Sequence, residues 1–259
     1  GNSFYNALDV KVVKRMTHGL QAQGSYTWGK DIDEGSVVAD SGEFLNSVQS
    51  PYNFFDKKLN RAPSDFNVAQ NLVLNVLWQV PAPSSWSRGA AHWLINGWQL
   101  GGIYTAQTGT PFTPILGCDV LGDPACSSLP DHPNRLTGSG CNTLSNPGNP
   151  NQYIRVQCLA FPNPSNILGN LGRNTVVGPG LSELDFSLVK NTPVRRVSEN
   201  FSIQFRAEFF NILNRANFQL PLDNLTVFDG SGNPVSFAGL IDSTDTTSRQ
   251  IQFALKLIW

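Results

Sequence analysis

The sequence is poor in charged residues: Asp, Glu, Lys and Arg make up only 14% of its 259 residues, and the formal net charge is −1. A typical soluble domain carries about 25% of these residues. No block of basic residues is present that could neutralise nucleic-acid phosphates. No apolar run approaches the roughly 20 residues of a membrane-spanning helix, and no signal peptide opens the chain. The chain is therefore expected to be a mature fragment or an excised region that does not bind nucleic acid.

Residues suited to catalysis are also scarce. The three histidines, His18, His92 and His132, fall in separate connections, and their spacing is not that of metal ligands. No GxSxG nucleophile elbow or other local catalytic signature is present. These features predict a protein that is not an enzyme and that has no catalytic residues, no metal and no cofactor.

Two further motifs are interpreted structurally. The stretch GNLGRN at 169–174 lacks the GK[ST] ending of a phosphate-binding loop and is interpreted as a turn that leads into a strand. The acidic residues Asp31, Asp33 and Glu34 could supply oxygen ligands for Ca²⁺, but they lack the spacing of a known calcium loop. They are interpreted as a solvated loop start.

The four cysteines, Cys118, Cys126, Cys141 and Cys158, all fall in one stretch rich in Gly, Pro and Asn. An even number of clustered cysteines favours two disulfides, and therefore an oxidising compartment. Three pairings are possible, of which Cys118 with Cys126 and Cys141 with Cys158 are favoured because they are local. Zinc is the alternative, although no CxxC pair is present and His132 is the only nearby histidine.

What the sequence does contain is a two-residue alternation of apolar and polar side chains. A period of two is typical of a β-strand with one apolar face. The pattern predicts strands at residues 8–12, 20–28, 71–79, 98–107, 184–188, 201–209 and 250–259.

The predicted connections alternate in length. Those at 16–19, 81–96 and 190–199 are the shorter ones, and those at 30–63, 109–180 and 213–248 are long. Strands linked in this way form an up-and-down antiparallel sheet with compact turns at one end and large loops at the other. Loops beyond about 15 residues are uncommon in compact domains. A general soluble fold would not require all of them to lie at one end of the sheet.

The two faces of the predicted sheet differ in chemistry. This pattern is typical of a transmembrane β-barrel, which presents apolar side chains to lipid and polar ones to a watery lumen. The prediction is an all-β fold: an antiparallel, up-and-down transmembrane β-barrel segment of about seven strands, with short periplasmic turns and long extracellular loops. A soluble β-sandwich is the alternative, since its strands also alternate.

Specific residues follow from this fold. The residues expected to face the lumen are Gln204, Arg206, Glu208, Gln252 and Lys256. Those expected to face lipid on the last strand are Ile251, Phe253, Leu255, Leu257 and Trp259. Arg206 and Glu208 could pair or contact a polar ligand, although a water-facing structural pair is the simpler reading. Trp28, Trp78, Trp98 and Trp259 are expected at membrane interfaces, where their amphipathic rings are favoured.

Several stretches together resemble the outer-membrane barrel region of TonB-dependent receptor-like proteins, in particular the Oar-like group with a carboxypeptidase-regulatory-like front domain. The matching stretches are SFYNALDVKVVKRMTHGLQAQGSYTWGKDID (3–33), INGWQLGGIYTAQTGTPFTP (95–114), GNLGRNTVVGPGLSELDFSLVKN (169–191), FRAEFFNILNRANFQLP (205–221) and RQIQFALKLIW (249–259). The Cys-bearing loop and residues 34–63 carry no such resemblance.

The resemblance implies a barrel of about 22 strands around a plugged lumen, of which residues 1–259 would be the C-terminal part. A plug and a TonB-contacting segment are absent from this chain, and 109–180 would be a long, Cys-containing extracellular loop. The complete protein would reside in the bacterial outer membrane, and would bind and import a bulky nutrient. The alternative is a non-transporting surface barrel or adhesin whose loops bind glycans or proteins.

The resemblance also implies a set of partners. They are outer-membrane lipid, the remainder of the barrel and its plug, the TonB complex, and the barrel-assembly machinery. The assembly machinery would recognise the last strand with its aromatic ending at Trp259.

Overall fold

The computed structural model describes residues 2–36, 57–81, 93–117, 131–163, 169–196 and 198–259. The fold is all-β and mostly antiparallel, as the alternation predicted. Within these ranges no helix has the length and apolarity needed to cross a membrane.

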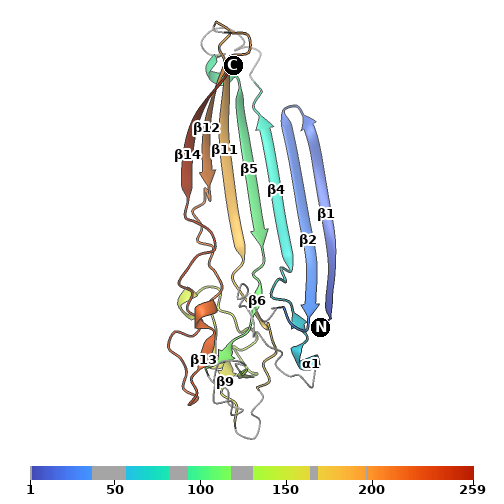
Figure 1. Ribbon diagram of the computed structural model, residues 1–259, viewed down its shortest axis with the longest axis vertical. Coiled ribbons are helices and arrows are strands. Elements are labelled where there is room, and N and C mark those ends of the chain that lie inside the picture. Colours follow the sequence, from blue (N-terminus) through green and yellow to red (C-terminus); the bar gives the residue numbers. More distant parts are fainter. Residues whose placement is uncertain (1, 37–56, 82–92, 118–130, 164–168, 197) are drawn as a thin grey trace.

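Seven long strands form one antiparallel sheet, and each pairs with its neighbour in chain order (Figure 1). They are β1 (Ser3–Thr17), β2 (Leu20–Asp33), β4 (Gln70–Gln79), β5 (Trp98–Gln107), β11 (Leu181–Pro193), β12 (Ser202–Phe210) and β14 (Gln250–Ile258). The two-residue strand β3 (Ala62–Pro63) pairs with the end of β2. All seven predicted strands are confirmed. The sheet is open, with β1 and β14 at the two ends of the path.

Three strands extend well past their predicted bounds, and one of them, β2, continues from the predicted end at residue 28 to Asp33. β1 begins at Ser3, five residues before its predicted start. The pattern did not reveal this part of the strand, because Tyr5 and Ala7 place apolar groups on its otherwise polar side. β11 likewise begins at Leu181 and continues to Pro193. The hydrogen-bonded register with neighbouring strands, and not the local pattern, sets these lengths.

The connections separate into two ends of the sheet (Figure 1). The turn end holds the three shorter connections, and the loop end holds the three long ones, as predicted. The β1–β2 hairpin closes through His18 (φ 51°) and Gly19 (φ 78°), a two-residue turn of the kind that needs positive φ at both positions. A Cβ on Gly19 would lie 2.4 Å from the carbonyl oxygen of Gln79, so the position accepts only glycine.

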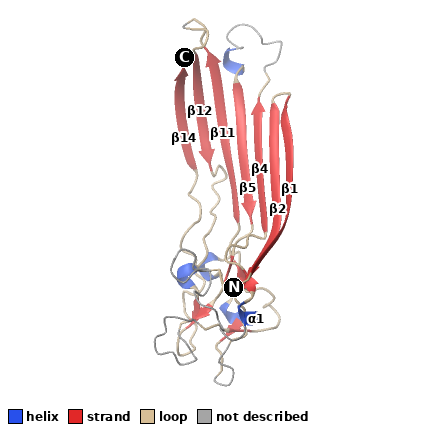
Figure 2. Cartoon of the chain, turned by 45° about the vertical axis from the view of Figure 1, so that its right-hand side comes forward, coloured by secondary structure: helices blue, strands red, loops and turns tan. Residues whose placement is uncertain are grey.

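The loop end is folded, with short elements of its own (Figure 2). Its helices are α1 (Lys57–Asn60) and the 3₁₀ helices η2 (Pro150–Gln152), η3 (Val156–Cys158) and η4 (Leu222–Asn224). Its strands form three pairs: β6 (Pro111–Phe112) with β10 (Val176–Val177), β7 (Ile115–Leu116) with β13 (Thr226–Phe228), and β8 (Asn134–Arg135) with β9 (Leu159–Ala160). The sequence predicted loops here, so this local order is an addition to the prediction.

The cluster of buried apolar residues lies in the loop end, whereas on the long strands of the described sheet only Val189 and Ala207 are buried apolar residues. Every member of this core cluster comes from 109–180 or 213–248, so these two long connections fold against each other. The members are Phe112, Leu116, Leu144, Tyr153, Ile154, Cys158, Leu159, Leu171, Val176, Leu225, Val227, Phe228, Ala238 and Ile241. A soluble sheet protein would place such a core against the sheet.

Candidate functional site

One side of the main sheet is a continuous apolar surface. Residues that pair directly across antiparallel strands share a side of the sheet. One such row crosses six strands through Leu20, Trp78, Leu100, Leu188, Ala207 and Phe253. We call this side of the sheet the apolar surface.

Much of the apolar surface is exposed, most of all on the two edge strands. On β14, Phe253 is 66% exposed and Leu255 is 68% exposed, and on β1 Val12 is 67% exposed. Phe253 stacks on Phe205 of β12 with ring centroids 6.2 Å apart, but nothing in the described chain covers the pair. An apolar surface of this extent typically marks contact with a membrane or with another protein.

The predicted lipid-facing residues of β14 lie on the apolar surface. Ile251, Phe253, Leu255 and Leu257 pair with Phe209, Ala207, Phe205 and Ile203 of β12. Trp259 follows the strand and is 84% exposed. The structure therefore brings the four strand residues together, and their contact with lipid stays a prediction.

The opposite side of the sheet is the polar surface. Gln204 of β12 pairs with Lys256 of β14, and Glu208 pairs with Gln252. Arg206 lies between these pairs, and its Nη1 is 3.8 Å from Oε1 of Glu208, with both side chains partly exposed. All five predicted lumen residues thus lie together on one side, and contact with a lumen stays a prediction.

A buried ion pair joins two distant segments at the loop end. Arg173 of the 109–180 connection pairs with Asp33 at the end of β2, and its Nη1 lies 3.6 Å from Oδ1 of Asp65. Its Nε donates to the carbonyl oxygen of Asn60 at 3.2 Å, and its Nη1 donates to Oγ of Ser36 at 3.1 Å. Arg173, Asp33 and Asp65 are buried. The interpretation of Asp33 as part of a solvated loop start was wrong.

Asn174 extends this network. Its side-chain Nδ2 donates to Oδ1 of Asp65 at 2.6 Å and to the carbonyl oxygen of Pro63 at 2.9 Å. Its backbone N–H donates to Oγ1 of Thr113 at 2.8 Å. Asn174 has φ 54°, a left-handed conformation that Asn tolerates better than most residues. The turn at residues 172–174, which we call the GRN turn, therefore connects the 109–180 segment to the segment that follows β2.

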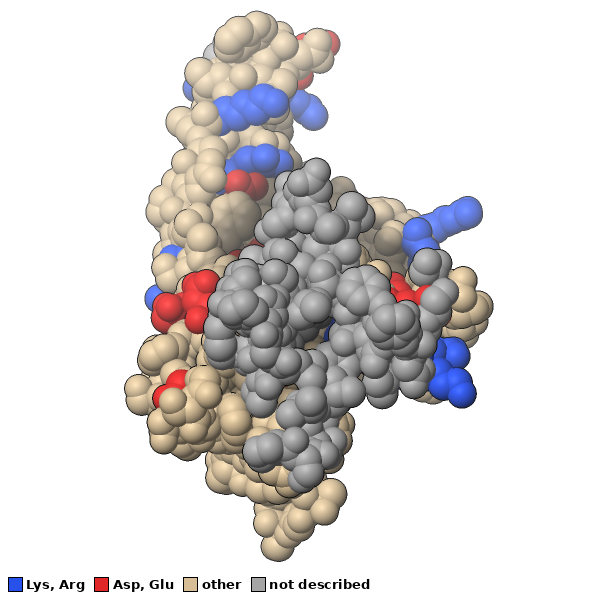
Figure 3. Space-filling view, turned by 60° about the horizontal axis from the view of Figure 1, so that its bottom comes forward, with Lys and Arg blue, Asp and Glu red and all other residues tan. Residues whose placement is uncertain are grey.

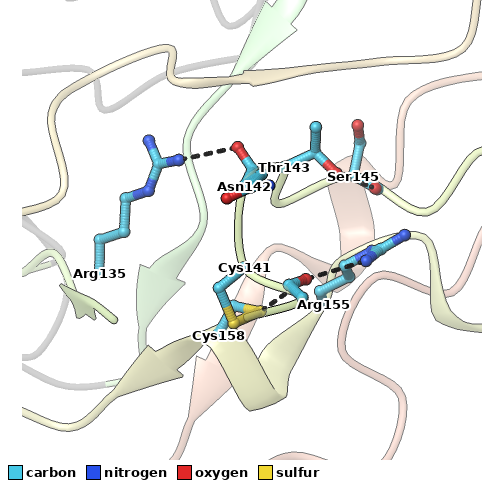
Figure 4. The surroundings of a disulfide bond; sticks show 8 residues. Arg135, Cys141, Asn142, Thr143, Ser145, Arg155 and Cys158 are labelled. Atoms are coloured by element: carbon cyan, nitrogen blue, oxygen red, sulfur yellow. Dashed lines mark hydrogen bonds between the residues drawn. A yellow bond between two sulfur atoms is a disulfide. The ribbon is translucent and has the colours of Figure 1, made fainter. Parts of the chain in front are cut away.

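A disulfide between Cys141 and Cys158 closes a second part of the loop end (Figure 4). Arg135 donates from Nη2 to the carbonyl oxygen of Asn142 at 3.1 Å, and Arg155 donates from Nη1 to that of Gly140 at 3.1 Å. The favoured Cys141–Cys158 pairing is thus present. The other two cysteines, at 118 and 126, lie outside the described residues.

His132 is fully buried beside the network. Its Nδ1 donates to the carbonyl oxygen of Leu171 at 2.7 Å. The pKa of His132 is lowered to about 4, mainly by burial and to a smaller extent by the positive charge of Arg173, against the opposing effect of the Leu171 hydrogen bond. The imidazole is therefore neutral in the folded protein at pH 7. Nearby, burial raises the pKa of Tyr153 to about 12, and its hydroxyl donates to the carbonyl oxygen of Val177 at 2.9 Å.

The depressed pKa of His132 makes the stability of the loop end depend on pH. The unfolded chain binds a proton at His132 below about pH 6.5, whereas the folded chain does not until about pH 4. The contribution of His132 to the free energy of unfolding is therefore complete above pH 6.5 and is lost as the pH is lowered towards 4. The loss is about 2.5 kcal/mol between pH 7.5 and 4.5. Hydrogen exchange of residues 131–163 at the two pH values measures this loss.

The variant His132→Gln should lack this part of the pH dependence, whatever its stability at pH 7.5. His18→Gln, at an exposed histidine in the turn end, is the matched control and should behave as the wild type. An unchanged pH dependence in His132→Gln would show that His132 is not the group responsible.

A cavity of about 480 Å³ lies where the loop end meets the sheet. Its lining combines aromatic, amide and carboxylate side chains, including Phe66, Gln107, Phe218, Gln219 and Asp245. Phe66 is 50% exposed and Phe218 is 36% exposed. Such a lining can contact both the apolar and the polar parts of a ligand. Over the described ranges, no three His, Cys, Asp or Glu side chains are grouped to hold a metal ion.

Sequence reasoning missed Arg173, Asn174 and the cavity. Arg173 and Asp33 are 140 positions apart, and neither has a neighbour in the sequence that signals the pairing. The GRN turn was recognised as a turn, but its role depends on contacts with a segment that the local pattern does not specify.

A family model described as an outer membrane beta barrel domain matches residues 1–252. No curated protein and no solved structure matches the chain. The family match covers nearly the whole chain, and it decides against the soluble β-sandwich that the sequence pattern had left open.

Proposed function

This chain belongs to the outer membrane beta barrel domain family, and from that premise we propose that it forms part of the wall of a TonB-dependent receptor that binds and imports a bulky nutrient. The observation that carries the proposal is the inverted arrangement of apolar groups. The buried core lies in the loop end, while the sheet exposes an apolar surface on one side and a polar surface on the other. A barrel wall between lipid and a watery lumen requires this arrangement.

In this proposal the loop end is extracellular and captures the ligand. Its buried core, the Arg173 network and the Cys141–Cys158 disulfide support a defined binding surface, because each restricts the motion of a long connection. The cavity at the junction with the sheet opens among Phe66, Phe218 and Gln107, and it is the proposed contact point for the ligand. The polar surface, with Gln204, Arg206, Glu208, Gln252 and Lys256, would line the path through the barrel.

The remaining partners belong to the same proposal. They are the rest of the barrel and its plug, the TonB complex and the barrel-assembly machinery. The open sheet supports the first of these, because β1 and β14 each present an unpaired edge within the described structure.

The proposal is tested by TonB binding of the full-length protein purified from outer membranes. Binding of the purified periplasmic domain of TonB, measured by surface plasmon resonance, is the expected result. A full-length protein that resides in the outer membrane but has no plug and does not bind TonB would overturn the transport proposal and favour the surface adhesin. Recovery of the full-length protein in a soluble fraction would overturn both.

Trp259 gives a prediction about assembly. We propose that the assembly machinery recognises β14 through its apolar residues and Trp259, which is 84% exposed. The variant Trp259→Ala should lower the amount of folded protein in the outer membrane several-fold, measured by heat-modifiable migration on gels. Lys256→Ala, on the polar surface of the same strand, is the control and should assemble normally. Equal assembly of the two variants would argue against a role for Trp259.

A further inference from the structure

A short segment at the turn end, residues 93–96, folds back over the apolar surface as one helical turn. Lys190 and Trp98 pair directly and lie on that surface. Nζ of Lys190 donates to the carbonyl oxygens of Trp93, Leu94 and Asn96 at 3.0, 3.1 and 2.8 Å, and Nε1 of Trp98 donates to that of Leu94 at 2.8 Å. Both donors come from the apolar side of the sheet. Residues 93–96 therefore lie over the turn end of the apolar surface.

This turn exposes apolar side chains at the edge of the sheet. Trp93 is 56% exposed and Leu94 is 59% exposed. The ammonium group of Lys190 lies 4.9 Å from the centre of the Trp98 ring, a cation–π distance. Its three carbonyl contacts use the donors of the ammonium group. Lys190 therefore positions the turn, and it is not the residue that would bind an added anion.

Two arginines lie beside the turn. Arg195 and Arg196, in the connection from β11 to β12, are exposed. With Trp93 and Asn96 they line a cavity of about 480 Å³. The planar guanidinium group binds phosphate oxygens through paired hydrogen bonds. The cavity thus combines phosphate-binding groups with an exposed indole ring.

The described part of the turn end also carries more basic than acidic residues. Apart from Lys256 on the polar surface, its described basic residues are Lys14, Arg15, Lys190, Arg195 and Arg196, against Glu199 as the acidic one. Figure 3, seen from the loop end, shows both basic and acidic side chains towards the far, turn end of the sheet. An excess of this kind attracts an anionic membrane surface.

We infer that the cavity formed by Trp93, Asn96, Arg195 and Arg196 binds the headgroup of an anionic glycerophospholipid, such as phosphatidylglycerol. The phosphate contacts the two guanidinium groups, and the acyl chains extend along Trp93, Leu94 and the apolar surface. The choice of a glycerophospholipid over lipopolysaccharide rests on the proposed orientation, in which the turn end faces the periplasmic leaflet. The site does not depend on transport.

Native mass spectrometry of the detergent-solubilised full-length protein tests this inference. The protein is titrated separately with phosphatidylglycerol, phosphatidylcholine and lipid A. The wild type should bind phosphatidylglycerol at least tenfold more tightly than phosphatidylcholine. The double variant Arg195→Gln/Arg196→Gln should lose about 25-fold in phosphatidylglycerol affinity, since each basic side chain near an anionic surface contributes about fivefold.

The matched control is Arg215→Gln/Arg249→Gln, which removes two exposed arginines at the loop end. It should keep the wild-type preference, and heat-modifiable migration confirms that each variant folds. Equal losses in both double variants would overturn the site in favour of a general charge effect. No preference for phosphatidylglycerol, or tighter binding of lipid A at the same arginines, would also overturn it. TonB binding by the same protein reports separately on the transport proposal.

Discussion

Replacing Arg173 with methionine is expected to destabilise the loop end by about 3 to 5 kcal/mol, because removing one member of a buried ion pair leaves its partners without the compensating charge. The partners are Asp33 and Asp65, which are 7% and 2% exposed. The guanidinium group also holds Ser36 and the carbonyl oxygen of Asn60 through hydrogen bonds. The effect should appear as faster hydrogen exchange in 57–66 and 169–177, while the seven long strands stay protected.

The control for this variant is Arg206→Met. Arg206 also pairs with a carboxylate, at 3.8 Å from Glu208, but its side chain is 46% exposed. Exposed ion pairs contribute about 0 to 1 kcal/mol, so Arg206→Met should have little effect on stability. Arg173→Lys should give an intermediate loss, since it keeps the charge but not the paired geometry. Similar small losses for Arg173→Met and Arg206→Met would contradict the assigned role of the buried network.

The variant Phe253→Arg is expected to destabilise the folded protein in a bilayer by about 2 to 4 kcal/mol, the cost of a lipid-facing Arg near the midplane of a barrel. Phe253 is central on β14 and contacts Phe205 across the strands. The measurement is the free energy of folding into phospholipid vesicles, from denaturant titration followed by Trp fluorescence.

Gln252→Arg provides the control one residue away. Gln252 is paired with Glu208 on the polar surface, so an added cation there should cost little. Position in the strand and the change in charge are nearly the same in the two variants, and only the side of the sheet differs. If Gln252→Arg cost as much as Phe253→Arg, the assignment of the two surfaces to lipid and lumen would fail.

The strands were predictable because their signal is local. Alternation along 250–259 or 201–209 already separates the two sides of the sheet, and short links place consecutive strands next to each other. Keeping apolar side chains on one side then excludes any shift by one residue from the observed register, which pairs Phe253 with Ala207 and Gln252 with Glu208. The same local reasoning identified Cys141 and Cys158 as a pair.

The loop end was not predictable from such patterns. Its core residues, such as Phe112, Ile154 and Val227, follow no period of two or 3.6, and they meet only when 109–180 and 213–248 fold together. The pairing of β7 with β13 joins residues more than a hundred positions apart. Arg173 contacts Asp33 in the same non-local way. Residues of this kind acquire a role from tertiary contacts, so a single sequence carries little trace of them.

The central claim is that the apolar surface contacts lipid and the polar surface contacts water. Nitroxide labels placed one at a time at positions 251 to 257, in the full-length protein reconstituted in vesicles, test it directly through collisions with oxygen and with a water-soluble nickel chelate. Oxygen concentrates in the bilayer core, so we predict high oxygen contact at Ile251, Phe253, Leu255 and Leu257, and high nickel contact at Gln252 and Lys256. A profile without a period of two, or nickel contact at the apolar positions, would contradict the account.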